Sequence, residues 1–224
     1  TGVRQGENLS PLLFSLYVND LETYFRHGGI EALNFKDDQI NNLLNLFVIL
    51  YADDTVILSN TAEGLQQALN QLKIYCNTWK LKVNPSKTKI AVFGGRKVKH
   101  DSYSFRYDGK DIGLVDEFKY LGITFKFNGN FDLCKKNLYD QASKAMFALL
   151  SRCNVLELPL DIQLELFDTM IIPIITYGCE TWGVKNNEII EKLHLRFCRY
   201  ILKVKNSTPK CMLYGELGRY PVDI

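Results

Sequence analysis

Residues 46–58 read Leu46-Phe47-Val48-Ile49-Leu50-Tyr51-Ala52-Asp53-Asp54-Thr55-Val56-Ile57-Leu58, with two adjacent carboxylates between two apolar runs. Apolar, β-branched runs with a sharp polar break between them predict the two strands of a hairpin. Neighbouring side chains of a strand point to opposite faces, but at a tight connection Asp53 and Asp54 can converge on one cation. Hard divalent ions such as Mg²⁺ prefer oxygen ligands, commonly one or two carboxylates together with substrate phosphates. The stretch therefore predicts a metal site for phosphate chemistry, and an ordinary Asp-containing turn is the alternative.

Three further segments surround this hairpin in the sequence. They read Gly2-Val3-Arg4-Gln5-Gly6-Glu7-Asn8-Leu9-Ser10-Pro11-Leu12-Leu13-Phe14, then Leu81-Lys82-Val83-Asn84-Pro85-Ser86-Lys87-Thr88, then Phe118-Lys119-Tyr120-Leu121-Gly122-Ile123. In this order with Tyr51–Asp54, they resemble consecutive blocks in the palm of the reverse transcriptases of non-LTR retrotransposons, of the Jockey and related kinds. A later part of the chain is also similar to this family, through Thr176-Tyr177-Gly178-Cys179-Glu180-Thr181-Trp182-Gly183 and Glu216-Leu217-Gly218. The resemblance therefore runs nearly from end to end.

The resemblance implies an α+β fold. Residues 1–125 are expected to form a partial right-hand polymerase palm, an antiparallel sheet with packed helices, and residues 126–224 a mostly α-helical thumb. In this family another catalytic aspartate lies on a strand before the Arg4-Gln5-Gly6 block, whereas this sequence starts at Thr1. We therefore expect a fragment that lacks the first catalytic strand and the fingers, and that is inactive as an isolated chain.

The resemblance also implies an activity. The intact parent would extend a DNA primer on an RNA template with deoxynucleoside triphosphates, by two-metal nucleotidyl transfer that uses Mg²⁺ or alternatively Mn²⁺. The family commonly primes from nicked chromosomal DNA, which implies an intracellular, nuclear site of action, although no targeting signal is visible in the sequence. No apolar run approaches the roughly 18 residues of a membrane span, so no membrane partner is expected. The oligomeric state is not predicted.

Roles for single residues follow from the matched blocks. Asp53 matches the main metal ligand of the family's hairpin and Asp54 its supporting neighbour, while Lys87 is a candidate proton donor to the leaving pyrophosphate, with Lys89 as its competitor. The nucleotide- and template-binding residues are expected to be Arg4, Gln5, Gly6 and Tyr51, and the primer grip Tyr120, Leu121 and Gly122. Each role has a structural alternative. The aspartates could be ordinary turn residues, the lysine a solvated surface residue, and Arg4-Gln5-Gly6 a helix-entry turn. Tyr51 could be a packed core tyrosine, and Tyr120-Leu121-Gly122 an ordinary hairpin.

The formal net charge of +2 hides a strong asymmetry along the chain. Residues 1–65 carry three Lys/Arg and nine Asp/Glu, residues 80–110 carry nine and two, and residues 185–210 carry seven and two. An acidic segment that contains the proposed metal ligands is thus followed by two basic ones, which suit the phosphates of a nucleic acid. Solvated charged faces are the alternative for each segment. The second function that the sequence allows is a non-catalytic nucleic-acid-binding remnant of a retroelement, and the third is a partner-binding domain on the same fold.

Six scattered cysteines without a Cys-x-x-Cys pair argue for free thiols in a reducing compartment rather than a zinc site at His194, Cys198 and Cys211. The periodicity predicts a first helix that starts at Ser10-Pro11 and ends at Gly28-Gly29, and a second that starts at a capping box of Asn60 with Glu63. A loop is expected over 31–42, strands over 88–93 and 117–125, and a hairpin turn at Asp108-Gly109. Further helices are expected over 132–153, 159–172 and 186–203, with Tyr177 and Trp182 as core residues.

Overall fold

A computed structural model describes residues 8–30, 33–36, 43–46, 48–51, 54–94, 103–183 and 188–222. The chain folds into two compact units, one formed by Thr1–Val92 with Val98–Val115 and the other by Phe93–Lys97 with Asp116–Ile224. Each unit is described by itself. The division lies before Asp116, upstream of the palm–thumb boundary expected after residue 125, and the assignment of palm and thumb stays a proposal.

Unit 1 contains the helices α1 (Ser10–Tyr17), α2 (Leu21–His27) and α3 (Ala62–Thr78). The single helix predicted from Ser10 is broken by a turn at residues 18–20, so that two short helices replace it. The side chain of Thr61 caps α3, because its Oγ1 accepts a hydrogen bond of 3.0 Å from the backbone N–H of Gly64. The predicted cap at Asn60 is therefore wrong by one residue.

Among the described residues of unit 1, the strands form four pairs. The strands are β1 (Leu33–Lys36), β2 (Leu43–Leu46), β3 (Val48–Tyr51), β4 (Asp54–Ile57), β5 (Ile90–Ala91), β6 (Phe105–Tyr107), β7 (Lys110–Ile112) and β8 (Leu114–Val115). The pairs β1–β2, β3–β4 and β6–β7 are antiparallel, and β5 pairs with β8 in parallel. Strand β1 corrects the loop predicted over residues 31–42, and the strand predicted over 88–93 is reduced to β5.

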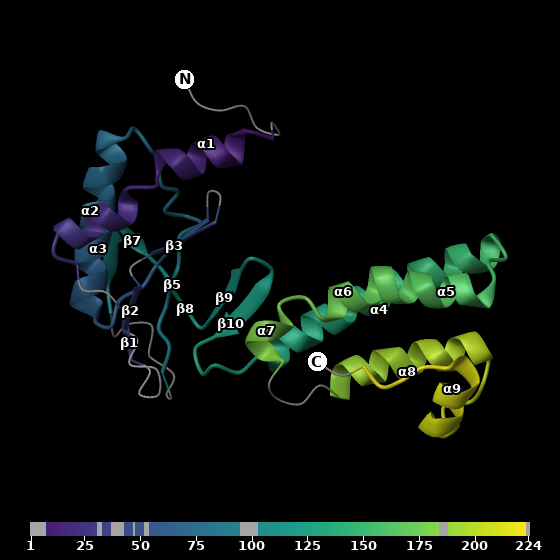
Figure 1. Ribbon diagram of the computed structural model, residues 1–224. Coiled ribbons are helices and arrows are strands. Elements are labelled where there is room, and N and C mark those ends of the chain that lie inside the picture. The colour runs from purple at the N-terminus through teal and green to yellow at the C-terminus, as the bar shows by residue number, and fades with distance from the viewer. Residues whose placement is uncertain are drawn as a thin grey trace. The chain divides into compact units, whose positions relative to one another are not determined.

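Helix α3 joins two small cores. Ala68 and Tyr75 belong to a core with Phe25 of α2, and the hairpin β3–β4 packs against it. Leu69 belongs to a second core formed with the hairpin β6–β7, beside which α3 lies in Figure 1. Gln66 of α3 also makes two hydrogen bonds to the backbone of Arg106, at 2.8 and 2.9 Å. One helix thus contacts two hairpins of unit 1, β3–β4 and β6–β7.

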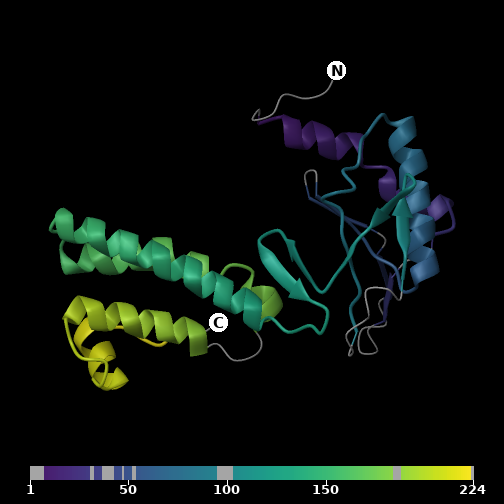
Figure 2. The same cartoon turned by 180° about the vertical axis from the view of Figure 1, so that it is seen from behind.

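Unit 2 begins with a hairpin and continues as helices. Its elements are β9 (Glu117–Tyr120), β10 (Ile123–Lys126), α4 (Asp132–Val155), α5 (Leu160–Leu166), the π-helical turn η2 (Phe167–Ile171), α6 (Ile172–Ile175), α7 (Cys179–Trp182), α8 (Glu188–Leu202) and α9 (Lys210–Leu217). Both views of the fold show α5 and α6 running beside α4 (Figures 1 and 2). The helices predicted near 132–153 and 186–203 and the α+β class are confirmed, while the strand predicted over 117–125 is a hairpin.

The core of unit 2 lies between α4, η2 and α8. The rings of Phe167 and Phe197 stack with centroids 3.9 Å apart, and both side chains are fully buried with Met146 and Leu150 of α4. The earlier segment Phe93–Lys97 also belongs to unit 2. The backbone N–H of Gly94 in this segment donates a hydrogen bond of 3.0 Å to the backbone carbonyl of Phe127.

A buried histidine ties the end of the described chain to this core. His194 of α8 is fully buried, and its Nε2 accepts a hydrogen bond of 2.7 Å from Nε of Arg219. Arg219 also forms an ion pair with Asp168 of η2, and Oε2 of Glu191 lies 3.7 Å from Nδ1 of His194. Tyr214 of α9 stacks on the imidazole. Since Nε2 accepts, the imidazole is neutral in this arrangement.

Burial first, and the neighbouring Arg219 guanidinium second, lower the pKa of His194, against the opposing effects of Glu191 and Asp168. Below the ordinary histidine value of about 6.5 the unfolded chain then binds more protons than the folded chain. We therefore expect the free energy of unfolding of unit 2 to fall as the pH falls from about 6.5 towards the lowered pKa of His194.

The measurement is urea unfolding between pH 5 and 8, followed by fluorine NMR of fluorotryptophan. Trp182 of unit 2 and Trp79 of unit 1 are the two tryptophans of the chain and report on the two units separately. In His194→Gln, which keeps an acceptor for Arg219, the decrease seen at Trp182 should disappear. An unchanged decrease in this variant would contradict the assignment to His194.

Candidate functional site

The hairpin β3–β4 carries the two adjacent carboxylates of the sequence. Its strands are antiparallel in a register that places Val48 opposite Ile57 and Tyr51 opposite Asp54. Ala52 and Asp53, which join the strands, lie outside the described residues. The predicted hairpin is thereby confirmed from its base to the last pair before the connection.

The alternation of side chains gives this hairpin a buried and an open face. Val48, Leu50 and Ile57 pack against the core of unit 1. Residues that neighbour them along a strand point the other way, and directly opposed residues share a face. Tyr51 and Asp54 therefore lie together on the open face, where 63% of Tyr51 is exposed. This exposure excludes the core-packing alternative for Tyr51.

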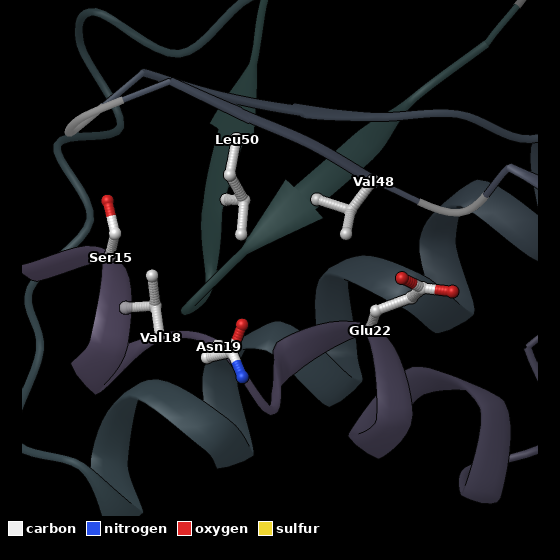
Figure 3. A pocket seen from close by; sticks show the side chains of 6 residues that line it. All are labelled: Ser15, Val18, Asn19, Glu22, Val48 and Leu50. Carbon is white, nitrogen blue, oxygen red and sulfur yellow. The ribbon is translucent and has the colours of Figure 1, made fainter.

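A hollow of about 270 Å³ lies behind the hairpin, on its buried face. Figure 3 shows Val48 and Leu50 pointing from β3 towards Val18 and Asn19 at the turn between α1 and α2. Because Val48 and Leu50 point away from the face of Tyr51 and Asp54, this hollow is separate from the predicted metal site.

The predicted lysine stands in a turn built by one asparagine. The Oδ1 of Asn84 accepts hydrogen bonds from the backbone N–H and the hydroxyl of Ser86, at 3.1 and 2.7 Å. The backbone carbonyl of Asn84 accepts hydrogen bonds from the backbone N–H groups of Lys87 and Thr88, at 3.2 and 3.1 Å. Both Lys87 and its competitor Lys89 are exposed. The Asn-x-x-Lys-Thr pattern therefore specifies a local turn that presents Lys87 to solvent.

The proposed primer grip is the turn of the β9–β10 hairpin in unit 2. Tyr120 pairs with Ile123, so Leu121 and Gly122 form a two-residue connection. Their φ angles are 46° and 85°, and two positive φ values are those of a type I′ turn. The ring of Tyr177 lies on this turn, and its hydroxyl donates a hydrogen bond of 2.8 Å to the carbonyl of Leu121.

The sequence predicted Tyr177 as a core residue, and its contact with this turn was not predicted. Tyr177 is 50% exposed, whereas Trp182 is 3% exposed and is confirmed in the core. A signal that could have found it was Gly178 directly after Tyr177, since glycine permits a close approach of the backbone to a neighbouring group.

The other predicted site residues are divided between undescribed residues and the two units. Arg4, Gln5, Gly6 and Asp53 lie outside the described residues, and the hairpins of Asp54 and of Tyr120 belong to different units. Within the described ranges, no group of three or more His, Cys, Asp and Glu side chains can hold a metal ion. None of the described helices is long and apolar enough to cross a membrane.

Two glycines in equivalent turns provide a matched test of the Tyr177 contact. Gly109 and Gly122 both follow a residue with positive φ in a two-residue hairpin turn. A Cβ on Gly109 would meet no atom within 4 Å, whereas a Cβ on Gly122 would lie 2.9 Å from Cε1 of Tyr177. We expect Gly109→Ala to cost roughly 1–2 kcal/mol through backbone strain alone, and Gly122→Ala to cost roughly 1–3 kcal/mol more through overpacking.

The costs are measured as free energies of unfolding from the fluorine signals of Trp79 for Gly109→Ala and of Trp182 for Gly122→Ala. Equal costs at the two glycines would contradict a close contact between Tyr177 and the β9–β10 turn.

Comparisons with known proteins now add to this geometry. The sequence family described as "Reverse transcriptase (RNA-dependent DNA polymerase)" matches residues 1–125. The chain is 26% identical to the "Probable RNA-directed DNA polymerase from transposon BS" of Drosophila melanogaster, over 99% of this chain and 24% of that protein. It is 23% identical to the "RNA-directed DNA polymerase from mobile element jockey" of the same fly, over 92% and 22% of the two chains.

A third relative is the "Retrovirus-related Pol polyprotein from type-1 retrotransposable element R2" of Popillia japonica, 26% identical over 96% of this chain and 35% of that protein. The chain thus spans about a quarter to a third of the length of these relatives. No solved structure gives a significant match. With the family matched over more than half of the chain, and with similar proteins from the retrotransposons BS, jockey and R2, this protein belongs to the reverse transcriptase family.

Proposed function

We propose that this chain contributes the carboxylate hairpin and the primer-binding hairpin of an RNA-directed DNA polymerase. The observation that carries the proposal is the open face of β3–β4, where Tyr51 and Asp54 lie side by side inside the segment that matches the reverse transcriptase family. The substrates would be an RNA template, a DNA primer and deoxynucleoside triphosphates, and the site of action the nucleus. The palm would comprise residues 1–125 and the thumb residues 126–224.

The donor set of the hairpin suits a hard divalent cation. Asp54 is exposed on a strand whose other face is held by the core, so its carboxylate has a fixed origin and free access. Asp53 and Asp54 would hold Mg²⁺, or alternatively Mn²⁺, and the bound ion would supply charge stabilisation for the transferred phosphoryl group. Tyr51, opposite Asp54, would offer its ring as a floor beside the primer end.

The remaining residues would bind and orient the reactants. Lys87, exposed on its Asn84-built turn, would protonate the leaving pyrophosphate. The backbone of the β9–β10 turn would hold the primer end in line with the attacked phosphate, a kind of positioning that lowers reaction barriers strongly. Arg4, Gln5 and Gly6 would contact the incoming nucleotide and the template.

The metal assignment predicts the result of a primer-extension assay. In a polymerase that contains these residues together with an upstream aspartate-bearing strand, Asp53→Asn should lower Mg²⁺-dependent incorporation by at least roughly a hundred-fold, because it removes a direct ligand. Asp54→Asn should have a smaller effect. The matched control is Asp111→Asn, since Asp111 is also exposed on a hairpin of unit 1 and pairs with Arg106 at the surface.

Full activity in Asp53→Asn would reject the polymerase mechanism proposed for this hairpin. The 224-residue chain alone is expected to incorporate no nucleotide, because a further catalytic aspartate is not among the motifs of its sequence. Incorporation by this chain alone would contradict that expectation.

The two exposed lysines can be separated by the same assay. Lys87→Met should lower the rate of incorporation by roughly a hundred-fold or more if Lys87 is the proton donor, while Lys89→Met should leave it nearly unchanged. The measurement is single-turnover incorporation with saturating nucleotide. The reverse order of effects would assign proton donation to Lys89. Equal small effects would mean that neither lysine is the proton donor.

The charge distribution favours a second function, nucleic-acid binding without chemistry. The basic segment 80–110 presents Lys82, Lys87 and Lys89 to solvent, and segment 185–210 presents Lys192, Arg196 and Lys203. Affinity for a primer–template duplex should then fall steeply with salt concentration. The longer polymerase is the protein that contains this chain together with an upstream aspartate-bearing strand. Salt-dependent binding without nucleotide incorporation by the longer polymerase would support the second function. No binding at low salt would support a partner-binding domain.

A further inference from the structure

Tyr177 grips the turn of the β9–β10 hairpin from a distant part of unit 2. Its hydroxyl donates to the carbonyl of Leu121 at 2.8 Å, across a sequence separation of 56 residues. Its ring covers the next residue so closely that a Cβ on Gly122 would lie 2.9 Å from Cε1. The two contacts fall on adjacent residues of the turn, so they fix both its position and its orientation.

Tyr177 is itself anchored in the unit. Its carbonyl accepts a hydrogen bond of 2.9 Å from Nε1 of the buried Trp182. The following residue, Gly178, has a φ of 66°, and a Cβ there would lie only 2.5 Å from Cδ1 of Ile123, the first residue of β10. Trp182 lies under the amine of Lys135 of α4, 5.4 Å from its ring centroid. The contacts of Tyr177 with the turn are thus connected through Trp182 to the helical core of unit 2.

The Leu121-Gly122 turn requires the contacts with Tyr177 because it is strained and belongs to a short hairpin. Leu121 adopts a φ of 46°, a left-handed conformation that is strained for a residue with a side chain. A hairpin of four residues in each strand gives little compensation by itself. The tip remains open to a ligand despite the tyrosine, because Gly122 is exposed. The Tyr177 contacts therefore stabilise a strained turn whose tip is accessible.

We propose that Tyr177 is a positioning residue for nucleotide incorporation, which acts by holding the Leu121-Gly122 turn in the conformation that seats the primer end. This inference rests on the proposed function, since it takes the β9–β10 turn as the primer grip. Tyr177 is not a catalytic residue, because its hydroxyl is used by the Leu121 carbonyl. Loosening the turn should disturb the alignment of the primer end rather than the affinity for the duplex.

The test is Tyr177→Phe in the longer polymerase, which removes the hydroxyl and keeps the ring. The matched control is Tyr200→Phe, because the hydroxyl of Tyr200 accepts a hydrogen bond of 2.9 Å from Asn154 in the same unit. We expect the maximal incorporation rate of Tyr177→Phe to fall by roughly ten- to a hundred-fold, with the Kd for primer–template unchanged within about two-fold. Hydrogen exchange of residues 117–126 should become faster in Tyr177→Phe alone.

Three outcomes would overturn the inference. These are a wild-type rate in Tyr177→Phe, a parallel loss of rate and duplex affinity, and an equal loss of rate in Tyr200→Phe. If Tyr177→Phe does not fold, as the Trp182 fluorine signal would reveal, p-aminophenylalanine at position 177 replaces it. This residue retains a donor for the Leu121 carbonyl, so a rate well below wild type would also overturn the inference.

The proposed function fails separately. It is rejected when the wild-type longer polymerase incorporates nothing or when Asp53→Asn keeps full activity. A wild-type polymerase that is active and sensitive to Asp53→Asn, but insensitive to Tyr177→Phe, would reject the positioning role alone.

Discussion

The pairing of Tyr51 with Asp54 is the constraint on which the candidate site depends. A β-strand has a side-chain period of two, so one register decides at once which residues are buried and which are open. With this pair at the end of the hairpin, Val48, Leu50 and Ile57 reach the core of unit 1. A shift by one residue would bury Asp54 and expose the apolar set. The hydrophobic effect on one face therefore maintains a carboxylate on the other.

In unit 2 the β9–β10 hairpin is held in place by additional contacts at its turn. This small hairpin places Ile123 and Phe125 of β10 in or against the core, and its turn is held by a tyrosine and a glycine that precede α7. The strain at Leu121 is sustained because the surrounding contacts leave the turn no other position, which is how strained backbone usually persists in proteins. The two hairpins differ in this respect, since both bury apolar side chains but β9–β10 is also held at its turn by a residue from a distant part of the chain.

The sequence predicted those features whose signal is local. The hairpin at Asp108-Gly109 was predictable because Asp-Gly is a typical type I′ turn. The same turn at Leu121-Gly122 was predicted only through the family resemblance and as its structural alternative, an ordinary hairpin, since leucine is unusual at positive φ and carries no local turn signal. The polar stretch around β1 concealed a strand that is defined by its pairing with β2. The network of His194 with Arg219 joins residues that nothing in the sequence connects. For the candidate site, the motif residues were identified from the sequence, but the residue that supports the grip was not.

The hydrogen bond between Gly94 and Phe127 has a consequence for how the chain is assembled. Unit 2 includes a piece of backbone that lies, in sequence, between two parts of unit 1. The units are therefore interleaved along the chain rather than consecutive, and closure of unit 2 requires a loop that contains β6, β7 and β8. A cut at Val115 would separate the helical unit from its own edge segment. Neither half is a natural unit for expression, and during synthesis the segment at Gly94 has no partner until Phe127 has been added to the chain.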